Sequence, residues 1–278
     1  LYGNDIEVSI SQLENFYADP YEYFLKYGLR LKPRDVFQLQ PAQTGLFYHE
    51  SLDHLVKYLR THDLDVASVS PERLNRIVEH VTNQILTDPQ ETRYRILNSS
   101  ARMNYVKSQL VRTVKEMAAS MHFQGYYTPM RPRSTEIAFN DSDQQPGQHL
   151  APLKFTINHK RPHRLLVQGR IDRIDTMSVN HQNYLGIVDY KSSPHAFDFG
   201  QIMTGTQLQM LTYLDVLNRN LARLYPGGRN HLSGALYSLI HLPQLSVKDL
   251  ERSRSLHLAT LGQHRYNGIL VKDRQLLN

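Results

Sequence analysis

The chain contains no cysteine among its 278 residues. Disulfide bonds, thiolate zinc sites and cysteine-ligated iron–sulfur clusters are therefore excluded within this sequence. It also lacks any apolar run near the roughly 20 residues that span a bilayer, and its first residues have no signal-peptide character. We therefore expect a cytoplasmic location and no membrane partner. No G-x-x-x-x-G-K-[ST] loop is present, so this chain is not expected to hydrolyse ATP.

The composition is that of a globular protein with a basic surface. With 40% hydrophobic residues, the chain is long enough for one large or two small domains. A net charge of +6 favours a polyanionic partner such as nucleic acid, although a merely soluble surface is the plain alternative. Because the chain opens on Leu1 and closes at Asn278 without a stop signal, we expect it to be a piece of a longer protein.

The order of predicted elements is helices first and a mixed α/β region second. Ser11 and Glu14 fit a capping box at the start of the first helix. Further helices are expected over residues 44–60, 71–86, 91–121, 205–225 and 246–263. Strands are expected over 135–139, 154–157, 164–175, 184–191, 232–239 and 268–271, with a polar loop over 140–147. This order predicts a helical subdomain over 1–125 and an α/β core over 126–278.

A hairpin is predicted in the run GRIDRIDTMSVNHQNYLGIVDYKSS. Two segments rich in β-branched and apolar residues flank a polar stretch, a pattern typical of antiparallel strands. A turn centred near Asn180 and His181 would place Asp172 opposite Asp189, with Cβ atoms about 5 Å apart on one face. Lys191 lies two residues beyond Asp189 and points the same way.

Two carboxylates and an ammonium group on one face are suited to metal-assisted cleavage of a phosphodiester. Carboxylates bind Mg²⁺, and a fixed lysine can stabilise charge in the transition state. A simple salt bridge between Lys191 and an aspartate is the alternative. Both strands have apolar faces, so they should be buried, where an unbalanced charge is costly and a functional site is favoured. Asp175 has the opposite parity to Asp172 and is expected to face the other side.

Three motifs in the same order resemble the PD-(D/E)XK nuclease superfamily and, within it, the RecB-like nucleases. GRIDRID, VDYKSS and LQMLTY match the family's G-x-x-D-R-I-D, D-Y-K and Q-x-x-x-Y pattern. Upstream, SISQLENFYADPYEYFLKYGLRL and GLFYHESLDHL are similar to the AddB/RexB branch, as is GALYSLIHLP downstream. The resemblance covers nearly the whole chain. It implies an α/β fold of the restriction-endonuclease-like type, a mixed sheet flanked by helices, with an N-terminal helical subdomain.

The resemblance also implies roles for individual residues. Asp172 and Asp189 would be metal ligands, Lys191 the catalytic lysine, and His49 a further ligand delivered from the helical subdomain. From the residues alone, a histidine at the edge of a buried helical stripe is more often a satisfied core residue. The implied cofactor is Mg²⁺, with Mn²⁺ as a substitute.

Three other polar residues are weaker candidates. Gln209 and Tyr213 lie four apart on one helical face and would touch phosphate or the water around the metal, unless they only pack against the sheet. Glu136 resembles an acidic position of the family, but its side of the sheet is not determined by the sequence. It therefore ranks below the others.

The chain departs from the AddB pattern at Asp19, where that family typically has a cysteine before a Pro-aromatic pair. Since one missing thiolate breaks a four-cysteine site, no iron–sulfur cluster is expected, as in a cluster-free RexB-like branch.

The resemblance implies a Mg²⁺-dependent exonuclease that processes DNA ends, single-stranded or duplex, during recombinational repair. It implies an AddA/RexA-like helicase–nuclease partner and cutting of the strand that ends 5′ at the break. Two alternatives stay open. One is a catalytically silent DNA-binding or assembly module of the same complex, and the other is a metal-dependent phosphoesterase acting on small nucleotides.

Two further clusters have both a functional and an ordinary interpretation. Arg131, Arg133 and the run HKRPHR over 159–164 could neutralise DNA phosphates or be solvated loops. For the aromatic group near the N-terminus, a place in the core of the first helix is favoured over a stacking platform for bases. Its members are Tyr17, Tyr21, Tyr23, Phe24 and Tyr27.

Overall fold

A computed structural model describes residues 5–32, 39–141, 149–158, 162–226, 228–240, 248, 255, 259 and 266–272. The helical elements are α1 (Ile10–Ala18), α2 (Pro20–Tyr23), η1 (Phe24–Gly28), α3 (Pro41–Thr61), α4 (Pro71–Thr87), η2 (Arg95–Asn98), α5 (Ala101–Tyr127), α6 (Phe199–Thr204) and α7 (Gln209–Leu224). The strands are β1 (Asp5–Ser9), β2 (Arg131–Phe139), β3 (His149–Leu150), β4 (Leu153–Asn158), β5 (Pro162–Val179), β6 (Gln182–Lys191), β7 (Arg229–Leu239) and β8 (Asn267–Leu270). No helix in these ranges is long and apolar enough to cross a membrane.

The described strands form one mixed sheet organised around the long strand β5. Its order is β3-β2-β5-β6-β7-β8, while β1 and β4 pair with the first half of β5. β6 and β7 run parallel, and β5 is antiparallel to β2 and β6. Residues 184–190 of β6 are all buried, as expected for a central strand whose apolar residues do not alternate with polar ones. The predicted α/β class with a helix-flanked mixed sheet is confirmed.

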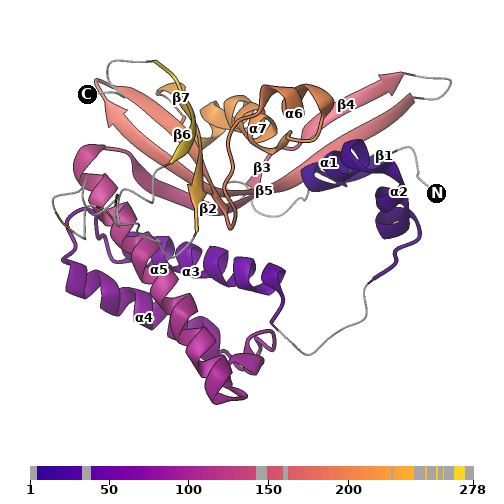
Figure 1. The fold of residues 1–278 in the computed structure, drawn as a ribbon. Helices are drawn as coiled ribbons and strands as arrows, with labels where there is room; N and C mark the ends of the chain where they lie inside the picture. Colours follow the sequence, from indigo (N-terminus) through magenta and orange to yellow (C-terminus); the bar gives the residue numbers. More distant parts are fainter. Residues whose placement is uncertain are drawn as a thin grey trace.

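Helices cover both faces of the sheet (Figure 1). On one face, α3, α4 and α5 share a hydrophobic cluster with Val188 and Tyr190 of β6. On the other face, α7 packs with Leu185 and Ile187, the residues of opposite parity. Asp189 has the parity of this second pair, so its side chain belongs to the α7 face.

The predicted hairpin register is confirmed. β5 and β6 pair from Arg173↔Val188 to Val179↔Gln182, which leaves Asn180 and His181 as a two-residue turn. Both turn residues have positive φ, at 51° and 61°, as a tight type I′ connection requires. The strands therefore run up to the turn, beyond the ends at residues 175 and 184 that the sequence predicted.

The N-terminal region differs most from its prediction. Residues 5–9 form β1, a strand that the sequence did not predict, which pairs parallel with β5 more than 150 residues away. The capping box of α1 joins Ser9 and Gln12 rather than Ser11 and Glu14. A strand added at the start shifts the first helical residue to Ile10, and with it the residues that can cap.

The boundaries of two other helices differ from the predicted ones for local reasons. The helix expected over 91–121 begins only at α5, after the short η2 turn, because Ser100 caps it, and it continues to Tyr127. The helix expected over 205–225 is divided, since Gly205 ends α6 with φ 83° and α7 begins at Gln209. The loop predicted over 140–147 and the helix predicted over 246–263 lie almost wholly outside the described residues.

The division into residues 1–125 and 126–278 stays a prediction. The α3–α5 cluster does draw mainly on the first segment. However, Val8 of β1 and Ile10 of α1 belong to the hydrophobic cluster on the α7 face of the sheet. The N-terminal strand and helix therefore pack with the α/β core that the prediction placed after residue 125.

Candidate metal and catalytic site

Three potential metal ligands converge from three different elements. His49 of α3, Glu136 of β2 and Asp172 of β5 offer ligand atoms that all lie within 4.8 Å of one another. His49 Nδ1 is 3.4 Å from Asp172 Oδ2 and 3.6 Å from Glu136 Oε1. One imidazole and two carboxylates form a donor set suited to a divalent cation.

The scaffold holds each of these side chains in place. On α3, Leu52, Leu55 and Val56 are almost completely buried, which fixes the rotation of the helix that carries His49. One turn further along, Asp53 accepts a hydrogen bond of 2.5 Å from the hydroxyl of Thr135, the residue before Glu136. This bond ties α3 to β2 beside the site.

Glu136 lies across from Asp172 because of the pairing between β2 and β5. Thr135 pairs with Arg173 and Ile137 with Ile171, which leaves Glu136 between them with φ 51°. A positive φ is rare for a non-glycine residue in a strand and often marks a functional position. From the sequence Glu136 ranks low as a candidate, since only the register of β2 reveals its side of the sheet.

The cluster holds a strongly basic histidine. Burial alone would lower the pKa of His49, but its hydrogen bonds to Asp172 and Glu136 outweigh burial and raise it to about 10. A protonated imidazole at neutral pH therefore offsets part of the charge of the two carboxylates, and a cation bound there would replace that proton. Asp172 Oδ2 also accepts the backbone N–H of Tyr190 at 2.9 Å.

Asp189 and Lys191 lie next to this cluster at the end of β6. Lys191 Nζ is 2.6 Å from Asp189 Oδ2, and the Asp189 side chain is 1% exposed. Burial raises the pKa of Asp189 to about 6, and the nearby charge of Asp172 adds to this effect. Apart from the ion pair, neither carboxylate oxygen accepts a hydrogen bond from the described residues. Among the described residues, this buried carboxylate therefore has lone pairs that no hydrogen-bond donor fills, apart from the contact with Lys191.

Lys191 is held from its other side by α7. Its ammonium group donates to Gln209 Oε1 at 2.7 Å, and the Gln209 amide donates to the hydroxyl of Tyr213 at 2.9 Å. Tyr213 is buried and packs edge-on against Phe139. The packing of α7 against the sheet, one of the alternatives for Gln209 and Tyr213, is present, whereas their contact with phosphate or with water around a metal stays a prediction.

The structure therefore gathers the residues proposed for the metal and catalytic site near the middle of β5 and the C-terminal end of β6, in two groups. His49, Asp172 and Glu136 form the cluster of potential ligands, and Asp189 lies outside it beside Lys191. The regular ladder ends at Arg173↔Val188, one step before Asp172 and Asp189 would pair. Asp175 faces the other side, as expected, and is bonded to Arg173.

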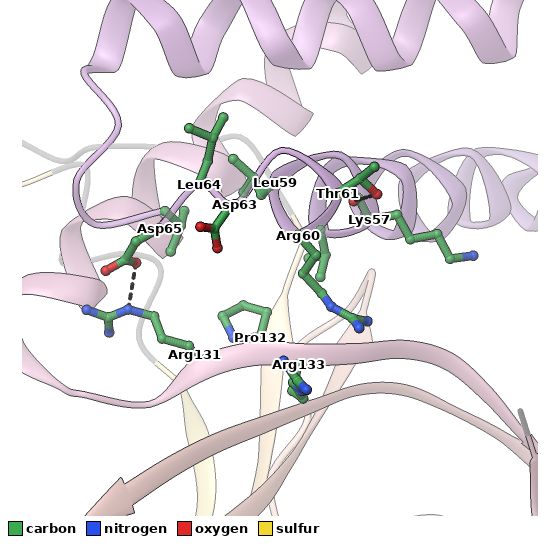
Figure 2. A pocket seen from close by; sticks show the side chains of 12 residues that line it. Lys57, Leu59, Arg60, Thr61, Asp63, Leu64, Asp65, Arg131, Pro132 and Arg133 are labelled. Carbon is green, nitrogen blue, oxygen red and sulfur yellow. Dashed lines mark hydrogen bonds and ion pairs between the residues drawn. The ribbon is translucent and has the colours of Figure 1, made fainter. Parts of the chain in front are cut away.

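The basic residues have mixed surroundings. Arg131 is engaged by Asp65 at 2.7 Å, which leaves it poorly placed to bind phosphate. Arg133 is exposed and lines a pocket between the end of α3 and the start of β2, together with Lys57 and Arg60 (Figure 2). Residues 159–161 of the HKRPHR run lie outside the described residues. Contact of DNA with this pocket stays a prediction.

The expectation that the N-terminal aromatic group forms the core of the first helix was wrong. Tyr17 is 57% exposed, Tyr21 70% and Phe24 49%, while Tyr23 and Tyr27 are half-buried. The helices here are short and the chain turns at Asp19, so the rings do not share one inward stripe. Asp19 itself caps α2 by accepting the backbone N–H groups of Tyr21 and Glu22.

Comparison with known proteins identifies the family of the chain. The family profile of the PD-(D/E)XK nuclease superfamily matches residues 7–268. The whole chain is similar to part of three bacterial proteins that are each named as a subunit of an ATP-dependent helicase/deoxyribonuclease. It is 44% identical to the protein of Lactiplantibacillus plantarum, 39% to that of Latilactobacillus sakei and 37% to that of Enterococcus faecalis. It spans 22%, 23% and 22% of the length of these relatives, respectively.

Proposed function

Because the chain belongs to the PD-(D/E)XK nuclease superfamily, we propose that it is a Mg²⁺-dependent deoxyribonuclease domain that hydrolyses the DNA backbone beside the middle of β5 and the C-terminal end of β6. The observation that carries the proposal is the convergence of His49, Glu136 and Asp172 beside the buried pair of Asp189 and Lys191. Three elements distant in the sequence meet to make this group. Such a concentration of charge at the end of buried strands is costly unless a cation balances it.

The residues present fit a divalent metal ion. His49, Glu136 and Asp172 would hold it, and the free lone pairs of Asp189 add a further acidic group. When bound, such an ion neutralises charge on the phosphodiester and makes water a better nucleophile. Hydrolysis adds a water oxygen to phosphorus, breaks one P–O bond and leaves a proton on the departing oxygen. Mn²⁺ would substitute for Mg²⁺ with the same donors.

Lys191 would stabilise charge that develops on the phosphate. Its ammonium group is held between Asp189 and Gln209, so it needs little reorganisation during the reaction. Asp189 would direct the lysine through their ion pair, while Gln209 and Tyr213 would set its position. Such polar groups must be placed accurately, because a small displacement of a catalytic group lowers the rate of cleavage strongly.

The biological setting is proposed from the relatives. Their names couple a helicase with a deoxyribonuclease and describe each protein as a subunit. We infer that this chain works on linear DNA, single-stranded or at duplex ends, with an AddA/RexA-like helicase–nuclease subunit as its partner. Cutting of the 5′-ended strand and a role in recombinational repair in the cytoplasm belong to the same proposal.

Removal of metal tests the proposal directly. With end-labelled linear DNA, cleavage is expected in Mg²⁺, no cleavage in excess EDTA, and recovery when Mg²⁺ or Mn²⁺ is restored. Gel electrophoresis measures cleavage of single-stranded, linear duplex and circular DNA. Hydrolysis of a dinucleotide tests the alternative that the protein acts on small nucleotides. DNA binding without cleavage in any metal would instead favour the catalytically silent module.

A Glu136→Gln variant is expected to bind metal at least about 10-fold more weakly, a cost typical even of outer-sphere partners. The substitution removes one negative charge from the three-residue cluster and keeps its shape. Calorimetric titration with Mn²⁺ measures the affinity. Glu79→Gln is the matched control, because Glu79 forms an exposed ion pair with Lys115 on α4 and α5. Equal affinity of both variants would place the metal elsewhere.

A further inference from the structure

We propose that Glu14 of α1 is a positioning residue of this active site, which sets the place of Lys191 through Gln209. The inference rests on the proposed nuclease function and deepens it. The sequence predicted that Glu14 would cap its own helix, but Ser9 and Gln12 cap α1 instead. The Glu14 carboxylate is therefore available for another element.

Glu14 caps α7, almost 200 residues away in the sequence. Its Oε1 accepts the backbone N–H of Leu208 at 2.7 Å and that of Gln209 at 2.9 Å. The N-cap residue of α7 is Leu208, whose side chain has no acceptor, whereas serine, threonine, aspartate and asparagine are preferred there. A carboxylate from α1 supplies both the missing acceptor and a negative charge that suits the positive end of the helix dipole.

The capped turn is the one that holds the catalytic lysine. Gln209 is the first residue of α7, and its side chain accepts from Lys191 and donates to Tyr213. The backbone N–H of Gln209 is thus fixed by Glu14 while its side-chain oxygen holds Lys191. A first helical turn without a cap frays, and fraying here would move the amide oxygen that directs the ammonium group.

The consequence is a continuous polar connection from the N-terminal helix to the buried carboxylate. It runs from Glu14 through Gln209 and Lys191 to Asp189, and every link is a hydrogen bond or ion pair of 2.6 to 2.9 Å. Glu14 itself acts through α7 and needs no contact with DNA. Its loss should therefore lower turnover without weakening substrate binding.

The test compares Glu14→Ala and Glu14→Gln with Glu22→Ala, an exposed glutamate on the adjacent α2. Glu14→Ala is expected to lower kcat about 10-fold and to leave KM for DNA within about twofold, since positioning is lost and binding is kept. Glu14→Gln retains an acceptor oxygen and should recover part of kcat. Hydrogen exchange at the amides of Leu208 and Gln209 should become faster in Glu14→Ala.

A double-mutant cycle separates positioning from general stability. Glu14→Ala combined with Gln209→Ala should be little worse than Gln209→Ala alone, because both changes act on one contact to Lys191. Losses that multiply, or a kcat of Glu14→Ala equal to that of Glu22→Ala, would overturn the inference. If Glu14→Ala fails to fold, Glu14→Gln takes its place in the same cycle and tests whether Glu14 acts through Gln209. A parent protein that does not cleave DNA would instead overturn the proposed function.

Discussion

Replacement of Asp189 by asparagine should reduce DNA cleavage about 10³-fold, the scale of losing a preorganised charged group in an active site. The substitution keeps the shape of a side chain that is 1% exposed and removes its charge. Lys191 then loses its counter-charge, and the acidic group beside the cluster of His49, Glu136 and Asp172 is lost. Cleavage of end-labelled linear DNA under single-turnover conditions in Mg²⁺ measures the change.

The same variant should not be less stable in the absence of metal. The folded-state pKa of Asp189 is raised from 3.8 to about 6, so its protonated form favours the folded state. The stability associated with that proton is present below pH 3.8 and is lost as the pH rises to about 6. At pH 8 asparagine carries no charge to bury, so the Tm of the variant in EDTA should equal or exceed that of the parent.

Asp215→Asn on the exposed surface of α7 is the control for cleavage. Cleavage by Asp189→Asn at the rate of this control would refute the assignment of Asp189 to the active site. A strongly lowered Tm would show instead that the carboxylate has a structural role. Inert DNA binding by parent and Asp189→Asn alike would favour the silent binding module.

Replacement of Asp175 by alanine should destabilise the protein by about 3–5 kcal/mol, the cost of leaving a buried charge without its partner. Arg173 is 2% exposed, and its guanidinium contacts both carboxylate oxygens of Asp175, at 2.7 and 2.8 Å. The hydroxyls of Tyr190 and Tyr266 also accept from it at 2.9 and 2.8 Å. Neutral hydroxyls do not compensate the charge once the carboxylate is gone.

Urea unfolding followed by circular dichroism measures this cost. Asp215→Ala breaks an exposed ion pair with Arg219 and should cost no more than about 1 kcal/mol, which makes it the matched control. A double variant, Arg173→Met with Asp175→Leu, should recover much of the loss, because an apolar pair of similar volume avoids the desolvation penalty. Equal midpoints for Asp175→Ala and Asp215→Ala would contradict the prediction.

The hairpin could be predicted from local sequence because its two strands are adjacent. Its register followed from a turn at Asn180 and His181, and alternation then separated Asp172 from Asp175. Glu136 could not be placed in this way. Its orientation depends on the pairing of β2 with β5 and on a positive φ, neither of which has a local signal.

The residues that cap α1 and α7 could not be predicted from the sequence alone. Ser11 and Glu14 fitted a capping box, but α1 begins at Ile10, directly after β1. Strand pairing over more than 150 residues cannot be inferred from a five-residue segment. The partner of Glu14 was likewise out of reach, since Leu208 gives no sign that its helix needs a cap from elsewhere.

The amino-acid sequence by itself determined the hairpin, the parity of its acidic residues, the Q-x-x-x-Y helix and the α/β class, because each depends on neighbours a few residues apart. Tertiary structure alone decided that Glu136 joins His49 and Asp172, that Asp189 lies beside Lys191 outside that cluster, and that Glu14 caps α7. These contacts join elements far apart along the chain. They form only when burial of the two faces of the sheet brings the helices against it. The conformational preferences of short segments do not predict such packing.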